Sequence, residues 1–196
     1  LILEPLVQCA AGMAMHDAEY LRLARALCDR YSVHLVVDEI AVGFGRTGSL
    51  FAHQQAGIRP DFICLSKGLT GGTLPLSAVL TTDEIYAAFY DDDAARGFLH
   101  SHSYTGNPLA CRAAVATLEL FEQLDQLVAN RQLAEKISAA FAGLNAHPRV
   151  SNARQQGMIW AWDIDTSLPD FAQRYHQAAL DLGLLLRPIG RTLYCM

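Results

Sequence analysis

Lys67 and Asp38 occupy the two positions best suited to covalent chemistry. Lys67 follows the apolar residues 62–65 and precedes flexible glycine residues. An amine in this setting can be partly desolvated, which favours its neutral, nucleophilic form and allows it to form a Schiff base. Asp38 directly follows the apolar residues 35–37, where a buried carboxylate needs a cationic partner such as a protonated pyridine nitrogen. The alternatives are a solvated lysine, and a carboxylate that caps a helix or forms a salt bridge.

A second polar group lies just before a predicted helix. Residues 100–103 read His-Ser-His-Ser, and Asn107-Pro108 supplies a helix cap followed by the residue favoured at the first helical position. Two histidines separated by one residue can bind zinc, but no third ligand is evident nearby in the sequence. Hydroxyl groups and backbone amides before a helix suit a phosphate better.

Arg187 is a cation between Leu186 and Pro188 in an otherwise apolar segment. Its guanidinium matches the two oxygens of a carboxylate. It either pairs with a carboxylate inside the protein or binds one on a substrate, and the spacing leaves both interpretations open.

The stretch from Gly43 to Gly48 satisfies the G-x-G-x-x-G pattern of dinucleotide-binding folds. Its context is poor for that function. Four residues separate Asp38 from the first glycine, no apolar helix begins at the third, and Asp61 precedes its strand where a ribose-binding acid should close one. Turn formation is the simpler interpretation, with a nicotinamide site as the alternative.

Short apolar runs predict the strands that position these residues. The first predicted strands are residues 1–6, 33–37, 62–65 and 77–80. Helical patterns alternate with them, which indicates an α/β fold with a mainly parallel sheet. Chemistry in such sheets lies at the carboxyl ends of the strands, where both Asp38 and Lys67 fall.

Helical spacing and a later change of pattern predict the remaining organisation. The predicted helices are residues 17–31, 82–90, 108–144 (with interruptions) and 169–182. The later predicted strands are residues 158–162, 184–187 and 192–195. A capping box from Thr81 to Glu84 opens the second helix. We place a domain boundary inside the long third helix, which divides the chain into residues 1–125 and 126–196.

The composition excludes several classes of protein. The chain has 196 residues, 52% hydrophobic and 18% charged, which is sufficient for a buried core. Its net charge of −5 argues against a nucleic acid partner. No apolar run approaches the ~18 residues that cross a bilayer, and no signal-peptide pattern is present, so we expect no membrane partner.

The cysteines and the chain ends indicate the redox state of the thiols and whether the chain is part of a longer protein. Cys9, Cys28, Cys64, Cys111 and Cys195 are scattered and odd in number, which favours reduced thiols in a cytoplasmic protein over a disulfide scaffold. Both ends of the chain are apolar and the first residue is not Met. Natural termini are usually polar and exposed, so we expect an internal piece of a longer protein.

Four motifs in this order resemble the class III pyridoxal-phosphate aminotransferases of fold type I. The motifs are Glu4-Pro5, Asp38-Glu39 with residues 43–48, Ser66-Lys67-Gly68, and Thr-Gly-Asn-Pro-Leu-Ala-Cys at residues 105–111. The resemblance covers the whole chain, as about the second half of a family member. It implies that residues 1–125 belong to a large cofactor-binding domain and residues 126–196 to a small α+β domain. It also implies a homodimer with shared active sites.

The resemblance implies pyridoxal 5'-phosphate as the cofactor and assigns residues to it. Lys67 would hold the cofactor covalently and later move protons. Asp38 would keep the pyridinium nitrogen protonated, so that the ring remains an electron sink. His102 and Ser103 match the stretch that binds the cofactor phosphate, which in this family reaches the site of the partner subunit. His102 stands where Pro is frequent in the family.

The resemblance also assigns residues to the substrate. Lys67 and Ser101 match substrate-contacting positions, and Arg187 would bind a substrate carboxylate. Glu4 matches a glutamate that pairs with that arginine in related enzymes. These assignments come from the motifs alone.

Within the family, Ala41 and the stretches 67–72 and 186–190 are most similar to members that act in biotin synthesis. This similarity implies S-adenosylmethionine as the amino donor and 8-amino-7-oxononanoate as the acceptor. The alternatives are another class III ω-aminotransferase, acting on ornithine, 4-aminobutyrate or a similar amine, and a fragment without turnover. Taken alone, these 196 residues are expected to be inactive and prone to associate.

Overall fold

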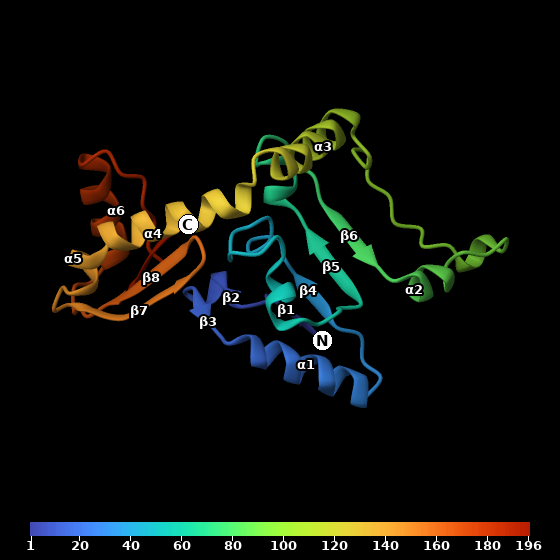
Figure 1. Cartoon of the computed structure of the whole chain (residues 1–196), viewed down its shortest axis with the longest axis horizontal. Coiled ribbons are helices and arrows are strands. Elements are labelled where there is room, and N and C mark those ends of the chain that lie inside the picture. The colour runs from blue at the N-terminus through green and yellow to red at the C-terminus, as the bar shows by residue number, and fades with distance from the viewer.

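The computed structural model describes residues 1–196 and has a mainly parallel sheet at its centre (Figure 1). Its strands, in spatial order, are β1 (Ile2–Leu3), β4 (Val36–Asp38), β5 (Phe62–Leu65) and β6 (Ala78–Thr81). The first three are parallel, and β6 runs antiparallel to β5. The predicted α/β class is confirmed.

Helix α1 (Ala18–Arg30) forms where it is predicted and covers the central sheet. The apolar spacing does not predict its buried face, because Tyr20, Leu23, Leu27 and Tyr31 are exposed. The Asp17 carboxylate caps the helix by accepting a hydrogen bond from the Glu19 amide at 2.7 Å. The inward face of α1 carries Leu21, Ala24 and Cys28, which lie in one buried cluster with Val37 of β4. Burial of this face is the main source of the stability of the helix.

Three further segments complete the first part of the chain. They are the hairpin of β2 (Val7–Gln8) and β3 (Ala14–Met15), the short α2 (Asp83–Ala87) and the long α3 (Pro108–Gln123). Short 3₁₀ turns connect the elements: η1 (Cys9–Ala11), η2 (Ala52–Ala56), η3 (Lys67–Thr70) and η4 (Ala94–Arg96). Asn107 caps α3 through a hydrogen bond from the Leu109 amide, as its sequence indicates.

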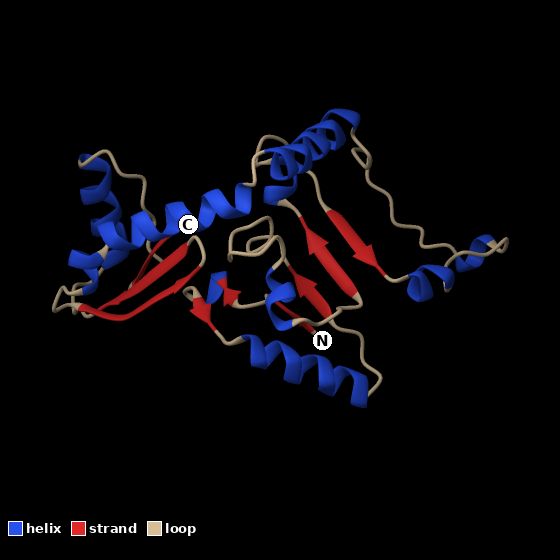
Figure 2. Ribbon diagram, viewed as in Figure 1, coloured by secondary structure: helices blue, strands red, loops and turns tan.

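A second, antiparallel sheet follows, and Figure 2 shows it set apart from the first along the long axis of the molecule. Its strands are β7 (Val150–Gln156), β8 (Ile159–Ile164) and β9 (Thr192–Cys195). The helices beside it are α4 (Gln126–Ala140), α5 (Ala142–Asn145) and α6 (Phe171–Asp181). Trp160 and Trp162 form its core against Phe141, with ring centroids 5.8 and 4.8 Å apart.

The two sheets share a buried interface. Ile159 and Ala161 of β8 lie in the same apolar cluster as Val37 of the central sheet. Arg154 of β7 donates to the backbone oxygens of Gly12 and Met13, at 2.6 and 2.9 Å. The division into domains at residue 125 stays a prediction, although α3 and α4 are separated at that point by Asp125 in a left-handed conformation.

Several predicted elements are wrong in extent. Residues 184–187 form no strand, because none of them pairs with another strand. The nearest pairing is a single bridge between Ile189 and Thr192. The helical stretch 108–144 is interrupted as predicted, and its breaks lie at Asp125 and at Phe141. Thr82, not Thr81, caps α2, which ends at Ala87.

None of the helices combines the length and the apolar character needed to span a membrane.

Candidate active site

Asp38 and Lys67 lie at the same edge of the central sheet. Asp38 is the last residue of β4, and its neighbour in the register of β5 is Cys64. Lys67 follows β5 after one further residue and opens the turn η3. Because β4 and β5 are parallel, their carboxyl ends meet there. The structure therefore brings these two residues together as the sequence predicts.

The backbone at Lys67 is held in an uncommon conformation. Its φ is +44°, in the left-handed region that side chains other than glycine and asparagine rarely adopt. Two hydrogen bonds enclose it, from Ser66 Oγ to the Leu76 oxygen at 2.7 Å and from the Gly72 amide to the Lys67 oxygen at 3.1 Å. Strain of this kind persists where the surrounding structure fixes it.

The side chain of Lys67 is exposed and forms neither a hydrogen bond nor an ion pair. The partial desolvation expected from the sequence is therefore not provided by these 196 residues. The Lys67 side chain is therefore unpaired and open to a ligand at this edge of the sheet.

Asp38 has a carboxylate oxygen available for a cation. Its Oδ1 accepts a hydrogen bond from the Ile40 amide at 3.0 Å, while Oδ2 has no donor and no ion pair forms. The side chain is half-buried, so an unpaired charge is costly there. A protonated ring nitrogen would fill this place, and the pair of a free amine and a free carboxylate oxygen thus fits pyridoxal phosphate.

Cys9 and Glu4 lie at the same edge, and the sequence gives no signal for Cys9. The Glu4 carboxylate accepts the Cys9 amide at 3.1 Å. Burial raises the pKa of the Cys9 thiol to about 11. The negative charge of Glu4 adds to this effect, whereas the positive charge of Lys67 opposes it. The charges of Lys67 and Asp38 also act on this thiol, in opposite directions. The predicted pairing of Glu4 with Arg187 is not formed.

Arg187 and the stretch Ser101-His102-Ser103 lie elsewhere. Arg187 is exposed on the segment between α6 and β9 and forms no ion pair, so the interpretation as an internally paired arginine is not supported. Ser101, His102 and Ser103 are exposed on the segment between α2 and α3, which extends away from the sheets (Figure 1). None of these four side chains is bonded to Asp38 or Lys67.

The structure is against a dinucleotide site at Gly43–Gly48. These glycines form turns within a loop of residues 40–51, here called the glycine loop, and only the 3₁₀ turn η2 follows. Asp61 is already bound by the Leu35 amide at 2.6 Å and by Arg25 at 2.7 Å. Burial opposes ionisation of Asp61, but these hydrogen bonds lower the pKa of its carboxyl group. The carboxylate therefore has a structural role and is already occupied by partners within the chain.

Comparison with known proteins places the whole chain in one family. The family description Aminotransferase class-III matches residues 1–196. Adenosylmethionine-8-amino-7-oxononanoate aminotransferases from Helicobacter pylori and Nitratidesulfovibrio vulgaris are 45% and 42% identical to it over its full length. The chain covers 46% and 38% of those two relatives, so it spans less than half of their length.

Solved structures agree with this result. The crystal structure of adenosylmethionine-8-amino-7-oxononanoate aminotransferase from Methanocaldococcus jannaschii matches 99% of the chain with a TM-score of 0.91 and 33% identity, over 48% of its own length. Ornithine δ-aminotransferase from Plasmodium falciparum matches the full chain with a TM-score of 0.85 and 28% identity, over 48% of its own length. The fold is thus that of fold type I aminotransferases, and the chain belongs to the class III aminotransferase family.

Proposed function

We propose that this chain is part of a pyridoxal-phosphate aminotransferase of biotin synthesis. The enzyme transfers the amino group of S-adenosylmethionine to 8-amino-7-oxononanoate and forms 7,8-diaminononanoate. The observation that carries the proposal is the free amine of Lys67 beside the unpaired carboxylate oxygen of Asp38, at the ends of neighbouring parallel strands. The names of the relatives that match the full chain at 42–45% identity support the choice of substrates.

Each candidate residue has a role that follows from its chemistry. The cofactor, when bound, withdraws electrons from the carbon that carries the amino group. Lys67 holds the cofactor covalently and, once substrate has displaced it, its amine carries a proton to and from that carbon. Asp38 keeps a proton on the ring nitrogen, because an anion at that position favours the cationic form. Arg187 binds a substrate carboxylate through its planar fork.

The reaction proceeds in two halves. In the first, the donor amino acid would leave as a 2-oxo acid, with Lys67 moving the proton and the bound cofactor supplying the acceptor of the amino group. In the second, 8-amino-7-oxononanoate would bind in the same place and receive the amino group, again with Lys67 moving the proton. The same residues act in both directions, since the second half reverses the first.

We also propose that the enzyme is a cytoplasmic homodimer. The segment between α2 and α3 carries the exposed apolar side chains Phe98, Leu99 and Tyr104, a surface suited to a second copy. Ser101, His102 and Ser103 on that segment then bind the cofactor phosphate and substrate in the site of the partner subunit. All five cysteines are free, as expected in a reducing compartment.

An amino-donor test decides between this function and its closest rival. The longest natural gene product that contains this chain is loaded with pyridoxal phosphate, and single donors are added while the visible absorbance of the cofactor is followed. S-adenosylmethionine is expected to bleach the band by converting the cofactor to its amino form, whereas ornithine and 4-aminobutyrate leave it unchanged. Bleaching by the simple amines alone would assign the protein to the other ω-aminotransferases, and a protein without any band would not be a pyridoxal-phosphate enzyme.

Arg187→Gln is expected to raise the KM for 8-amino-7-oxononanoate about 10- to 100-fold, because a charge-assisted bidentate bond to a carboxylate is lost. The matched control is Arg191→Gln, an exposed arginine four residues further along the same segment. Steady-state kinetics with both variants measure the effect. Equal KM values for Arg187→Gln and the unmodified enzyme would remove Arg187 from the substrate site.

A further inference from the structure

A fully buried carboxylate lies directly beside the candidate site. Glu39 follows Asp38 and has no exposed surface. Its Oε1 accepts the His53 amide at 2.9 Å and His53 Nδ1 at 2.8 Å, and its Oε2 accepts the Ala52 amide at 2.9 Å. Because a carboxylate accepts but does not donate, His53 contributes its hydrogen through Nδ1.

These bonds close the glycine loop. The backbone of Glu39 is fixed to the sheet by a 3.0 Å bond from its amide to the Cys64 oxygen, and its own oxygen accepts the Gly43 amide at 2.8 Å. Its side chain then reaches the start of η2, at the far end of the loop. Burial of a carboxylate costs free energy unless the carboxylate is hydrogen-bonded. The Ala52 amide, the His53 amide and His53 Nδ1 supply these bonds, so the position of Glu39 depends on the position of η2.

A line of aromatic contacts leads from His53 to Lys67. The His53 ring is stacked on Phe51, with centroids 6.0 Å apart and an interplanar angle of 13°. Phe51 meets Phe44 edge-on at 5.6 Å. Phe44 in turn lies so close to Gly68 that a Cβ added there would be 2.8 Å from the Phe44 Cβ.

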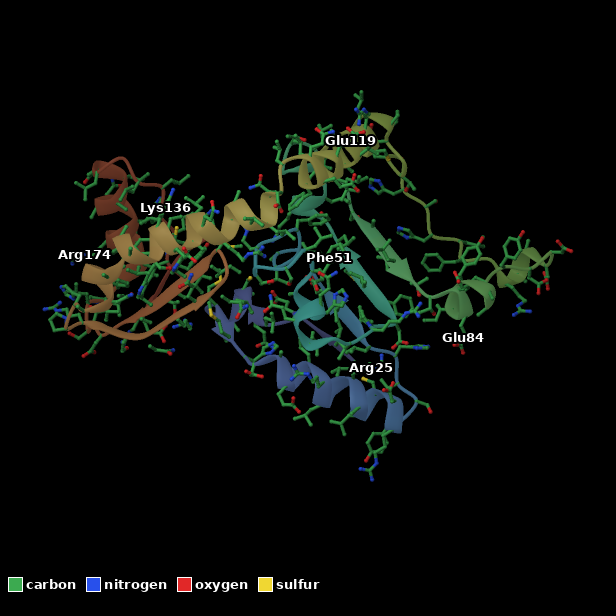
Figure 3. All side chains as sticks on the ribbon, viewed as in Figure 1. Arg25, Phe51, Glu84, Glu119, Lys136 and Arg174 are labelled. Atoms are coloured by element: carbon green, nitrogen blue, oxygen red, sulfur yellow. The ribbon has the colours of Figure 1, made fainter.

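Phe51, labelled in Figure 3, is partly buried and packs against the cluster that contains Phe44. Phe44 belongs to a buried cluster with Leu65, Leu69 and Ala114. In the sequence, Leu65 precedes Lys67 and Leu69 follows it. The glycine loop is therefore packed against the turn that carries Lys67. At its other end, the loop follows Asp38 and Glu39 directly in the sequence.

We propose that Glu39 and His53 are positioning residues for the cofactor site. Their buried bond holds the glycine loop against Gly68, and so fixes Asp38 and Lys67 relative to each other. Neither residue touches the cofactor; each acts through the neighbours named above. The inference rests on the proposed function, because only a molecule bound at both Asp38 and Lys67 senses their separation.

The test compares three variants of the longest natural gene product, each loaded with pyridoxal phosphate. His53→Leu removes the Nδ1 donor. His53→Asn keeps a donor, because the side-chain amide nitrogen of asparagine takes nearly the position of Nδ1. Gln54→Ala is the matched control: Gln54 lies in the same turn and accepts the Phe51 amide at 3.0 Å, but it does not contact Glu39. The readouts are the visible absorbance maximum of the cofactor and its dissociation constant.

We expect His53→Leu to weaken cofactor binding about tenfold and to shift the absorbance maximum, since one bond to a buried carboxylate is lost. His53→Asn and Gln54→Ala should bind the cofactor as the unmodified protein does. If His53→Leu does not fold, Glu39→Gln provides the same comparison, because its amide nitrogen would face the Ala52 amide.

Two results would overturn the inference alone: an unchanged band and affinity in His53→Leu, or an equal loss in Gln54→Ala, which would indicate a general weakening of the turn. The absence of any band in the unmodified protein would instead overturn the proposed function, and this inference with it.

Discussion

Lys67→Ala is expected to abolish covalent retention of pyridoxal phosphate and to lower the transamination rate by at least about 10³-fold. The side chain of Lys67 is unpaired in the structure, and it lies at the same sheet edge as Asp38, the proposed partner of the ring nitrogen. No other group at this edge of the sheet can replace it. The thiol of Cys9 holds its proton firmly, because burial raises its pKa to about 11.

The sequence offers a sharp control for this experiment. The chain contains only two lysines, Lys67 and Lys136. Lys136 is exposed on α4 and lies beside the second sheet, away from the central one (Figure 3). Borohydride reduction of the loaded protein, followed by peptide mass spectrometry, should place the cofactor on Lys67 in the unmodified enzyme and in Lys136→Ala. A label on another lysine, or activity that survives Lys67→Ala, would contradict the assignment.

Gly157→Ala is expected to destabilise the protein by about 3–5 kcal/mol. Gly157 lies in the turn between β7 and β8 with φ +58°. A Cβ there would press directly on the carbonyl carbon of Thr47 and lie 2.7 Å from the Gly48 nitrogen. Because these are backbone atoms, they cannot rotate away as a side chain could. The β7–β8 turn would have to move away from the glycine loop. The 2.8 Å bond from the Met158 amide to the Arg46 oxygen would then be lost.

Gly190→Ala separates this contact from backbone strain. Gly190 has nearly the same φ, +59°, but no atom lies within 4 Å of its added Cβ. Only the cost of the left-handed conformation remains, about 1–2 kcal/mol. Urea unfolding of both variants of the longest natural gene product measures the difference. Similar losses in the two variants would show that the β7–β8 turn does not depend on its contact with the glycine loop.

The sequence predicts the central sheet and its reactive edge because local patterns determine them. Apolar runs end sharply at Asp38 and just before Lys67, and parallel strands bring such ends together. The helix α1 is predicted for the same reason, from a capping aspartate and regular apolar spacing. These features depend on neighbours only a few residues apart.

The missed features depend on distant or unusual contacts. Strand β7 is mostly polar and pairs only with β8, so no apolar alternation marks it. Glu39 and His53 are brought together by the closure of the glycine loop, which no spacing rule anticipates. Arg154 bonds to Met13 across 141 residues of sequence. Conversely, the apolar run at 184–187 has the composition of a strand but no partner in this chain.

The interface shared by the two sheets limits which movements can assemble a complete site. Ile159 and Ala161 lie in the central core, and Arg154 binds the β2–β3 hairpin, so the second sheet cannot swing as a rigid body without opening that core. Arg187 lies on the segment 184–190, whose start is held by the 2.6 Å bond between His176 Nδ1 and the Leu186 oxygen. The proposed binding of a substrate carboxylate by Arg187 would therefore require a rearrangement of this segment alone, because the second sheet is fixed to the central core.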